Sequence, residues 1–522
     1  MRQRFLPACL AAFLSALAFA QPTYRVGTRL VQVDVAVRTD KGVVPGLTRD
    51  DFTVQDKGKT QNIAVFSVTG RNGPNQPLTP LPANVASNRM NHRGEKSQNA
   101  TVILFDRLNT PDPMDQANAR TKVLALLRSL KPADRVAFYS LYDTLTPVQE
   151  FLDSPERLAG AAARMDAQGG AGGDSLDLAL RDALNPAQSI NVVARVQITA
   201  AAFRSIARRL SGIPGRKTLL WLTSSVPLTY GTGVSRRSDD QAEVDSLVRI
   251  LSDANIVLYA IDVRGVGTSF TQPASDKPVE GGLMARAGSR IAVDQEVIQS
   301  ANSLSGDQGL QLIAEQTGGK AYLNVNDVSI PLREALDFAD ATYTLGFYVD
   351  EKALDGKVHD LSVKIARRPE ANGAKVYARK NYLAAAAAPQ HAGIHELAAD
   401  KLDATQIGVM AATAPDPSRP GIHVAQVRVS GADLQFERRG DKWTASFDLG
   451  LALEAGGRST DVSVKTIQLP ELTEDQLRQA FVGGLDIDNT IPSPSQAGML
   501  RVVVQDKLSG AAGSVRVPIA PQ

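Results

Sequence analysis

Apolar and polar positions alternate along residues 26–69 with the period of a half-buried strand. Four valines stand at every second position from Val31 to Val37, separated by polar residues or alanine. The turn-forming run Asp56–Lys59 then separates two further apolar stretches, as in a β-hairpin. The N-terminal part of the chain is therefore expected to be built from strands.

The pattern changes at Thr101, where Thr101–Phe105 is a nearly continuous apolar run. Such a run is typical of a central parallel strand that is covered on both faces. Strand-like and helix-like patterns then alternate as far as residue 341, which predicts an α/β doubly wound fold with right-handed crossovers. Strands are expected at 101–105, 135–142, 147–152, 217–223, 256–261 and 320–323, and helices at 113–130, after Ser154, at 199–210, and around 244–251, 310–313 and 332–339. The strand at 147–152 follows its predecessor so directly that it must pair antiparallel, at an edge of the sheet.

Three more strand-like segments, at 343–349, 358–365 and 375–379, follow the α/β region. About three strands are too few for an independent core, and residues 22–69 face the same difficulty. We therefore expect 22–69 and 342–383 to pair into one β-sandwich, with an α/β domain at 100–341 inserted between them. Residues 70–99 are rich in Pro, Asn and Gly and are expected to form a linker.

The rest of the chain is expected to hold a second linker at 384–407 and a β-rich domain at 408–522. Two apolar runs, 500–504 and 515–519, are spaced to pair across a turn. One short helix is expected between strands, because Thr473–Gln476 has the spacing of a capping box. We interpret this region as a second β-sandwich.

Length and composition agree with several soluble domains. The chain has 522 residues, of which 43% are hydrophobic and 21% are charged, and domains usually hold roughly 100–200 residues. The formal net charge of +2 gives no electrostatic basis for binding nucleic acid or an anionic membrane.

The first twenty residues have the order of a secretory signal. Arg2 and Arg4 precede an apolar run from Phe5 to Ala20 that ends in Ala-Phe-Ala, so residues 1–20 are expected to be removed on export. The alternative is an uncleaved anchor, but the apolar run is shorter than the roughly 20 residues of a membrane span. We expect an exported protein, in the periplasm, at the cell surface or in the medium, with no membrane span after signal removal.

The expected fold predicts where a ligand would bind. Ligands of doubly wound sheets bind outside the carboxyl ends of the strands, where the strand order reverses. Three expected strand ends are polar, at 106–112, 223–225 and 262–265, and the glycine-rich loop 169–175 could converge on them. The predicted ligand-binding residues are Asp106, Asn109, Thr110, Asp112, Ser224, Ser225, Asp262 and Arg264.

Several segments occur in an order that points to a known family. They read LVQVDVAVRTDKG, GLTRDDFTVQDKGKTQNIAVFSV, VILFDRLNT, PGRKTLLWLTSS, ANIVLYAIDVRG, LIAEQTGGKAY, YTLGFY and ARKNYL. From about Leu30 to Leu383 the chain thereby resembles a von Willebrand factor A-related family of exported acidobacterial proteins, whereas the C-terminal third lies outside the resemblance. The resemblance implies a von Willebrand factor A-like fold and a function in binding.

The resemblance also implies a metal-ion-dependent adhesion site, in which Asp-x-Ser-x-Ser, a loop Thr and an Asp after the fourth strand hold Mg²⁺. Here Asp106 and Thr110 match, but Leu108 replaces the first Ser and Ser224 replaces the second Asp. This degenerate site could still bind Mg²⁺ or another divalent cation, which tolerates several waters. The candidate metal ligands are Asp106, Thr110 and Asp174. The alternative is that Asp106 and Asn109 brace the loop by bonding to nearby backbone amides.

A second class of function, a GDSL-like serine hydrolase, is suggested by the block Gly173–Leu176, with Ser175 as nucleophile. A serine nucleophile needs a base within hydrogen-bond reach. None of the five histidines has the Asp three residues earlier that this hydrolase family uses, so the hydrolase is the weaker hypothesis.

Two other groups could carry chemistry. His391 and His395 are four residues apart and could share a metal on a helix, but no third ligand is evident. Arg204, Arg208 and Arg209 could form a basic contact patch, although we expect them on a solvated helix face. The sequence therefore predicts an exported adhesion or scaffold protein, not an enzyme, that binds a protein or surface ligand. A metal-free structural module remains an alternative.

Overall fold

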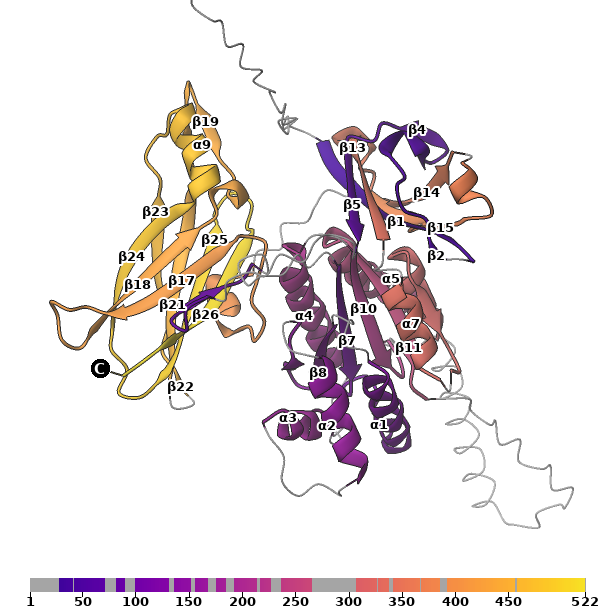
Figure 1. The fold of residues 1–522 in the computed structure, drawn as a ribbon, viewed down its shortest axis with the longest axis horizontal. Helices are drawn as coiled ribbons and strands as arrows, with labels where there is room; N and C mark the ends of the chain where they lie inside the picture. Colours follow the sequence, from indigo (N-terminus) through magenta and orange to yellow (C-terminus); the bar gives the residue numbers. More distant parts are fainter. Residues whose placement is uncertain are drawn as a thin grey trace, which may run out of the picture.

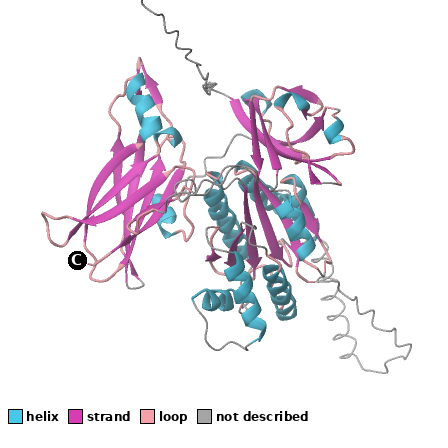
Figure 2. Cartoon of the chain, in the orientation of Figure 1, coloured by secondary structure: helices cyan, strands magenta, loops and turns pink. Residues whose placement is uncertain are grey.

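The computed structural model describes residues 28–40, 42–70, 81–89, 99–130, 136–151, 155–167, 175–184, 192–213, 216–226, 236–264, 307–325, 327–337, 341–366, 368–384, 392–455 and 458–521. Figures 1 and 2 show a central region of helices and strands and two regions made mainly of strands. The chain is thus a mixed α/β protein of several domains, as predicted. The expected signal segment 1–20 lies outside the described residues. In the described part of the chain, no helix is both long and apolar enough to cross a membrane.

A six-stranded sheet forms the centre of the α/β region, in the order β12-β11-β10-β7-β8-β9 (Figure 1). Neighbouring strands are parallel except for β8 and β9, which confirms the predicted antiparallel edge. Because β7 is the first strand of the region and β10 the fourth, the order reverses between these two neighbours. The strands are β7 (Asn99–Asp106), β8 (Val136–Leu141), β9 (Leu145–Gln149), β10 (Arg216–Thr223), β11 (Ile256–Asp262) and β12 (Lys320–Tyr322).

Helices cover both faces of this sheet. One buried cluster joins one face to α4, α5 and a helix over 307–316, and a second joins the other face to α1, α2, α3 and α7. The helices are α1 (Pro113–Arg128), α2 (Pro155–Ala167), α3 (Ser175–Ala183), α4 (Val192–Ser211), α5 (Arg236–Asp253) and α7 (Ser329–Asp337). Helix α3 was not predicted, although Leu176, Leu180 and Ala183 are buried at helical spacing.

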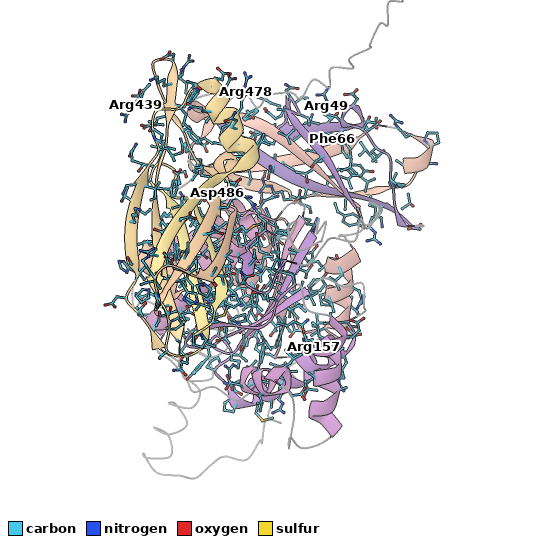
Figure 3. All side chains as sticks on the ribbon, turned by 60° about the vertical axis from the view of Figure 1, so that its left-hand side comes forward. Arg49, Phe66, Arg157, Arg439, Arg478 and Asp486 are labelled. Carbon is cyan, nitrogen blue, oxygen red and sulfur yellow. The ribbon has the colours of Figure 1, made fainter. Side chains whose placement is uncertain are left out.

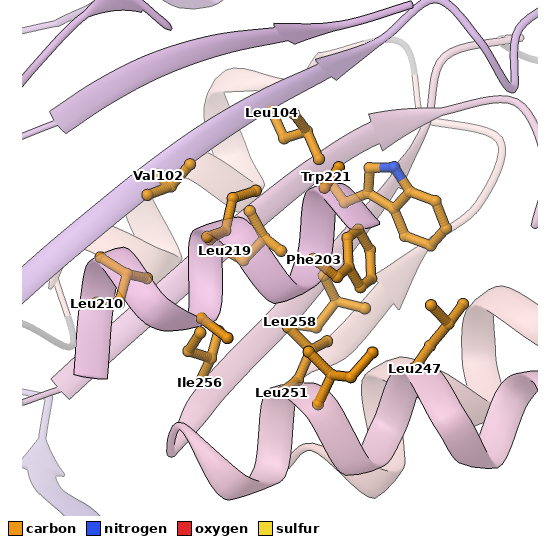
Figure 4. Close-up of a cluster of buried hydrophobic side chains, with 14 of the residues drawn as sticks. Val102, Leu104, Phe203, Leu210, Leu219, Trp221, Leu247, Leu251, Ile256 and Leu258 are labelled. Carbon is orange, nitrogen blue, oxygen red and sulfur yellow. The ribbon is translucent and has the colours of Figure 1, made fainter. Parts of the chain in front are cut away.

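Trp221, on β10, belongs to the first cluster and lies beside Phe203 of helix α4 (Figure 4). Its ring meets Phe203 edge to face, with centroids 5.1 Å apart and an interplanar angle of 78°, a favoured arrangement for buried aromatic pairs. Both side chains are fully buried. This packing places the indole nitrogen close to the end of the neighbouring strand, β7.

Strands from before and after the α/β region pair with each other. One sheet has the order β15-β1-β13-β5, with β2 also on β1, and the other has the order β16-β14-β3-β4. Their facing apolar side chains form one core. The strands are β1 (Thr28–Thr39), β2 (Gly42–Val43), β3 (Phe52–Asp56), β4 (Lys59–Gln61), β5 (Val65–Gly70), β13 (Ala341–Asp350), β14 (Lys357–Ile365), β15 (Lys375–Tyr377) and β16 (Asn381–Ala384), with short 3-10 helices η1 (Arg49–Asp51), η3 (Glu351–Ala353) and η4 (Pro369–Ala371).

The C-terminal region contains two more packed sheets. Their orders are β24-β18-β17-β6 and β22-β21-β25-β26, with β23 also on β21, beside the hairpin β19-β20. Leu500 pairs with Val517 and Val502 with Val515, as the apolar spacing predicted. The elements are β17 (Val409–Pro415), β18 (Ile422–Val429), η5 (Gly431–Asp433), β19 (Glu437–Arg439), β20 (Lys442–Thr444), β21 (Ser446–Ala455), β22 (Arg458–Ser459), β23 (Ser463–Gln468), α9 (Glu474–Gly483), β24 (Leu485–Pro492), β25 (Gly498–Asp506) and β26 (Ala512–Ile519). The predicted capping box is present at Thr473, which begins α9.

Both expected linkers contain structure that the sequence pattern did not show. Within 70–99, β6 (Val85–Ser87) pairs with β17 of the C-terminal region. Within 384–407, α8 (Ile394–Ala399) packs against the apolar side chains of Val503 and Ala512. Both elements are too short to show a periodicity, and each depends on contacts with residues far away in the chain.

The α/β region contacts its two neighbours at different places. At the amino end of β11, Asn255 donates a hydrogen bond to Asp34 of β1, at 2.9 Å. On α4, Arg208 donates to Asp400 at 2.9 Å, and the amide of Thr405 donates to the Arg208 carbonyl at 3.0 Å. Lys401 also donates to the hydroxyls of Thr144 and Thr146, just after the carboxyl end of β8, at 3.2 and 3.1 Å. The carboxyl ends of β7, β10 and β11 take no part in these hydrogen bonds.

The expectation of a solvated face for Arg208 and Arg209 is wrong. Both side chains are largely buried; Arg208 pairs with Asp400, and Arg209 pairs with Glu150 at 2.9 Å. A spacing rule along one helix cannot show that another domain packs against it. Arg208 and Arg209 therefore form intramolecular ion pairs and do not form a basic contact patch.

Candidate functional site

The predicted site residues lie at the carboxyl end of the central sheet, on both sides of the point where the strand order reverses. Asp106 is the last residue of β7, and Ser224 follows β10, its parallel neighbour. Asp262 ends the next strand, β11. The fold therefore brings these three strand ends together, as the sequence predicted.

The carboxylate of Asp106 is fully buried, and each of its oxygens accepts hydrogen bonds from the protein. Oδ1 accepts from the backbone amide of Asn109 at 2.9 Å. Oδ2 accepts from Asn109 Nδ2 at 2.7 Å and from Trp221 Nε1 at 2.8 Å. Asp106 is thus hydrogen-bonded both to Asn109, in the loop that follows β7, and to Trp221 of β10.

The next residues of the loop bind to the segment after β10. The Thr110 hydroxyl donates to the Asp106 carbonyl at 2.8 Å and accepts from the Ser224 amide at 3.2 Å. The hydroxyls of Ser224 and Ser225 both donate to the Asn109 carbonyl, at 2.8 and 3.1 Å. Polar side chains that were predicted to bind a ligand thus connect these two loops by hydrogen bonds.

Asn109 extends the network to helix α4. Its Nδ2 donates to Thr199 Oγ1 at 2.8 Å, and its Oδ1 accepts from Arg195 Nε at 3.3 Å. Thr199, Arg195 and Trp221 were not predicted as part of the site. Trp221 lies inside an apolar strand, and the two helix residues are about 90 positions away from Asn109, so no local pattern could have found them.

Burial dominates the electrostatics at Asp106. It raises the pKa of the carboxyl above its usual value of 3.8, although hydrogen bonds from Asn109 and Trp221 and the charge of Arg195 act in the opposite direction. A group in low dielectric favours its neutral form unless donors or cations compensate for lost water. The donors around Asp106 supply that compensation only in part.

A second group of charges lies at the end of β11. Arg264 binds both oxygens of Asp262, at 2.9 and 3.1 Å, and also pairs with Asp307. Asp112 accepts hydrogen bonds from the amides of Met114 and Asp115 and so caps α1. Burial and the nearby Asp112 charge raise the pKa of Asp115. This group is more accessible than Asp106, because Asp112 is exposed and Arg264 is half-buried.

The described residues do not fit a divalent cation at Asp106. Asn109 and Trp221 already occupy three of the roughly four acceptor positions of this fully buried carboxylate, whereas a divalent cation needs an oxygen-rich shell. Leu108, which replaces a serine ligand of the resembling family, is buried in the apolar core. Asp174 lies outside the described residues. Among the described residues, no group of three or more His, Cys, Asp and Glu is arranged to hold a metal ion.

Two of the described histidines have their partners outside the α/β region that contains Ser175. Ser175 is the first residue of α3. His359, in the N-terminal sandwich, binds Asp56 and Asp355, and His423, in a C-terminal strand, contacts Ser493. His395 lies on α8, whereas His391, its proposed partner, is outside the described residues.

Comparisons with known proteins show likeness at a low level. No family model and no curated protein matches the chain. A solved structure described as von Willebrand factor type A from Catenulispora acidiphila is 10% identical and covers 88% of this chain and 74% of its own, with a TM-score of 0.24. An aerotolerance-related membrane protein from Bacteroides fragilis is 12% identical and covers 46% of this chain and 96% of its own, with a TM-score of 0.24. The PilB minor pilin from Streptococcus sanguinis, solved as a mutant, is 12% identical and covers 47% and 61%, with a TM-score of 0.27.

These low sequence identities and TM-scores do not support any conclusion about the function of the chain. A von Willebrand factor A protein is among the matched structures, but the order of the six central strands describes the α/β region more directly. The function must be argued from the side chains at the strand ends.

Proposed function

We propose that the chain is an exported adhesion or scaffold protein of the von Willebrand factor A-related family, and that it binds a partner protein or a surface ligand without a metal at Asp106. The ordered sequence segments support the family, and the N-terminal apolar run supports export. The reversal of strand order between β7 and β10 supports a ligand surface at their carboxyl ends.

The observation that carries this proposal is the inward direction of the Asp106 hydrogen bonds. All three donors belong to the protein, so the carboxylate holds the loop after β7 in one shape. A binding surface on a preorganised loop loses less entropy when a partner docks. Asp106 is therefore a positioning residue, and the residues that follow it in the loop make the contact.

The exposed end of this loop and the first turn of α1 have the composition of a contact surface. Met114 is 71% exposed, beside exposed Asp112 and close to the half-buried charges of Asp115 and Arg264. Methionine is a flexible apolar side chain that adapts to partner surfaces. We infer that Met114 is the apolar centre of the contact and that Asp112 and Arg264 flank it.

Photocrosslinking in the cells that produce the protein tests this proposal. A photoreactive amino acid is placed at position 114 of the full chain, and a matched chain carries it at Leu508, which is 45% exposed in the C-terminal region. We expect a discrete adduct from position 114 that is absent from position 508 and weakened by Arg264→Glu. The adduct should persist in excess chelator.

Two results would contradict the proposal. Equal crosslinking from both positions, or none from position 114, would remove the carboxyl-end surface as the binding site and leave a structural module. Loss of the adduct in chelator, with recovery on adding Mg²⁺, would show that a cation takes part.

A further inference from the structure

We propose that strand β24 (Leu485–Pro492) is a docking edge for an extended segment of a partner protein, in which basic and aliphatic side chains alternate. Among the described residues, β24 is the last strand of its sheet and pairs over all eight residues with β18, on one side only. It lies on the side of the C-terminal sandwich remote from the α/β region (Figure 1). This site is separate from the carboxyl-end surface of the central sheet.

The backbone of β24 presents regular hydrogen-bonding groups along its free edge. The amide of Ser493 donates to the Gly421 carbonyl at 2.9 Å, and the pairing register continues this alignment. Because backbone direction alternates along an antiparallel strand, the odd-numbered residues bond to β18. The N–H and C=O groups of Asp486, Asp488 and Thr490 therefore point away from the sheet. Pro492, which has no N–H, falls in the same outward set, where proline is tolerated.

Most other edge strands among the described residues are short or guarded; β5 (Val65–Gly70), at the end of the N-terminal sheet beside β13, is the exception, and its six residues carry no charge. β4, β6, β12, β15 and β16 have three or four residues. β9 has a proline, Pro147, at its centre, whereas the proline of β24 is its last residue. β26 is covered by the chain, since Ser514 donates to the Ala404 carbonyl at 2.9 Å. On β23, Lys465 stands opposite buried Leu449, and such an inward charge prevents strand addition. β24 has no bulge in its pairing and no charge on its inner face.

The side chains of β24 select the chemistry of the added strand. Its outer face carries Asp486 and Asp488, both exposed. Asp486, labelled in Figure 3, is bound by Arg428 at 2.6 and 2.9 Å, whereas Asp488 has no ion pair among the described residues. Ile487 and Ile491 are half-buried at the rim of the apolar core. A lysine or arginine beside Asp488, with aliphatic residues beside the two isoleucines, would match both faces.

A second copy of the same strand matches less well. It would bring two further aspartates to the face that already carries Asp486 and Asp488, and like charges on neighbouring strands are destabilising. Strand addition supplies affinity through main-chain hydrogen bonds and specificity through alternate side chains. The geometry therefore points to a basic, extended partner segment.

The probe for this proposal is a ten-residue peptide of alternating lysine and valine, titrated into the full chain by fluorescence anisotropy. We expect saturable binding that weakens at least tenfold in Asp488→Lys and is abolished by Thr490→Pro. Asp441→Lys, an exposed aspartate in the β19-β20 turn, is the matched charge control and should bind normally. Circular dichroism verifies that each variant is folded.

Modified peptides keep the proposal testable if Thr490→Pro fails to fold. A peptide with N-methyl groups on alternate amides keeps its charge but cannot pair with an edge, so it should not bind the unaltered chain. Equal binding of the N-methylated and unmodified peptides would overturn the proposal, as would full binding by Asp488→Lys. A concentration-dependent dimer of the chain that Asp488→Lys strengthens would show that β24 serves self-association instead.

Discussion

Replacing Asp106 by asparagine should destabilise the α/β domain although the two side chains have almost the same size. The three donors that face the carboxylate come from the Asn109 amide, Asn109 Nδ2 and Trp221 Nε1. An asparagine offers one acceptor oxygen and one NH₂ group, so in either orientation an N–H must face another N–H. One buried donor is left unpaired, which costs about 1–3 kcal/mol. For a domain of this size each kcal/mol lowers Tm by roughly 2–4 °C, so the expected fall is several degrees.

The difference in stability between the unaltered chain and Asp106→Asn should also depend on pH, and the pKa shift of Asp106 predicts the direction of that dependence. Burial raises the pKa of Asp106 above 3.8 in the folded chain. A carboxyl with a raised folded pKa stabilises the fold at pH below its unfolded pKa and loses that contribution as the pH rises through the folded pKa. Asparagine has no such titration. The stability difference between the unaltered chain and Asp106→Asn should therefore shrink as the pH rises from about 4 to neutrality.

Thermal unfolding followed by Trp221 fluorescence measures both effects. The chain has two tryptophans, so a Trp443→Phe background leaves Trp221 as the single reporter, inside the α/β core. Asp112→Asn is the matched control, because its exposed side chain caps α1 and asparagine caps about as well. A variant as stable as its parent would refute the bracing role of Asp106. A stability difference that grows with pH would show that the folded pKa of Asp106 is lowered and would contradict the predicted sign. A Tm that rises with Mg²⁺ only when Asp106 is present would indicate a cation site.

Two further predictions concern the outer domains. Arg208→Met should lower the stability of the full chain by about 2–4 kcal/mol, because it leaves the largely buried Asp400 without its cation. Scanning calorimetry measures this loss, with Arg204→Met on the same helix as the control. Equal unfolding transitions in the two variants would contradict the prediction. In the N-terminal sandwich, the amide of Lys357 is the main cause that lowers the pKa of Asp355 to about 2. A lowered folded pKa stabilises the fold above the unfolded pKa of 3.8, and this contribution is lost as the pH falls through about 2. Thermal melts in this acid range should therefore show a smaller fall of Tm in Asp355→Asn than in the unaltered chain, and parallel curves would count against the shift.

The pattern of apolar and polar residues along single segments predicted those helices and strands whose buried side chains recur every few residues. The apolar run Thr101–Phe105 became the inner strand β7, and the strand at 147–152 was expected to pair antiparallel because its connection is too short for a crossover; β9 does so. The pairing between 500–504 and 515–519 followed from alternation alone. Such features depend on side chains a few residues apart, so the sequence contains them directly.

Short elements that depend on distant partners were not predictable. Strand β6 has three residues and exists because β17 offers it an edge, while α8 rests on side chains of β25 and β26. Arg208 looked like a solvated residue because its partner, Asp400, lies 192 positions away. No periodicity along one segment carries information about such contacts.

At the candidate site the sequence determined the place, and the tertiary structure decided the chemistry. The order of elements put Asp106 and Ser224 at neighbouring strand ends, where a doubly wound sheet binds ligands. Whether the Asp106 carboxylate faces solvent or the protein depends on Trp221, 115 positions later, and on the packing of Phe203 that orients the indole. Donors brought together by the fold occupy both oxygens, so the residue that a motif would assign to a cation instead stabilises the loop that we propose as the binding surface.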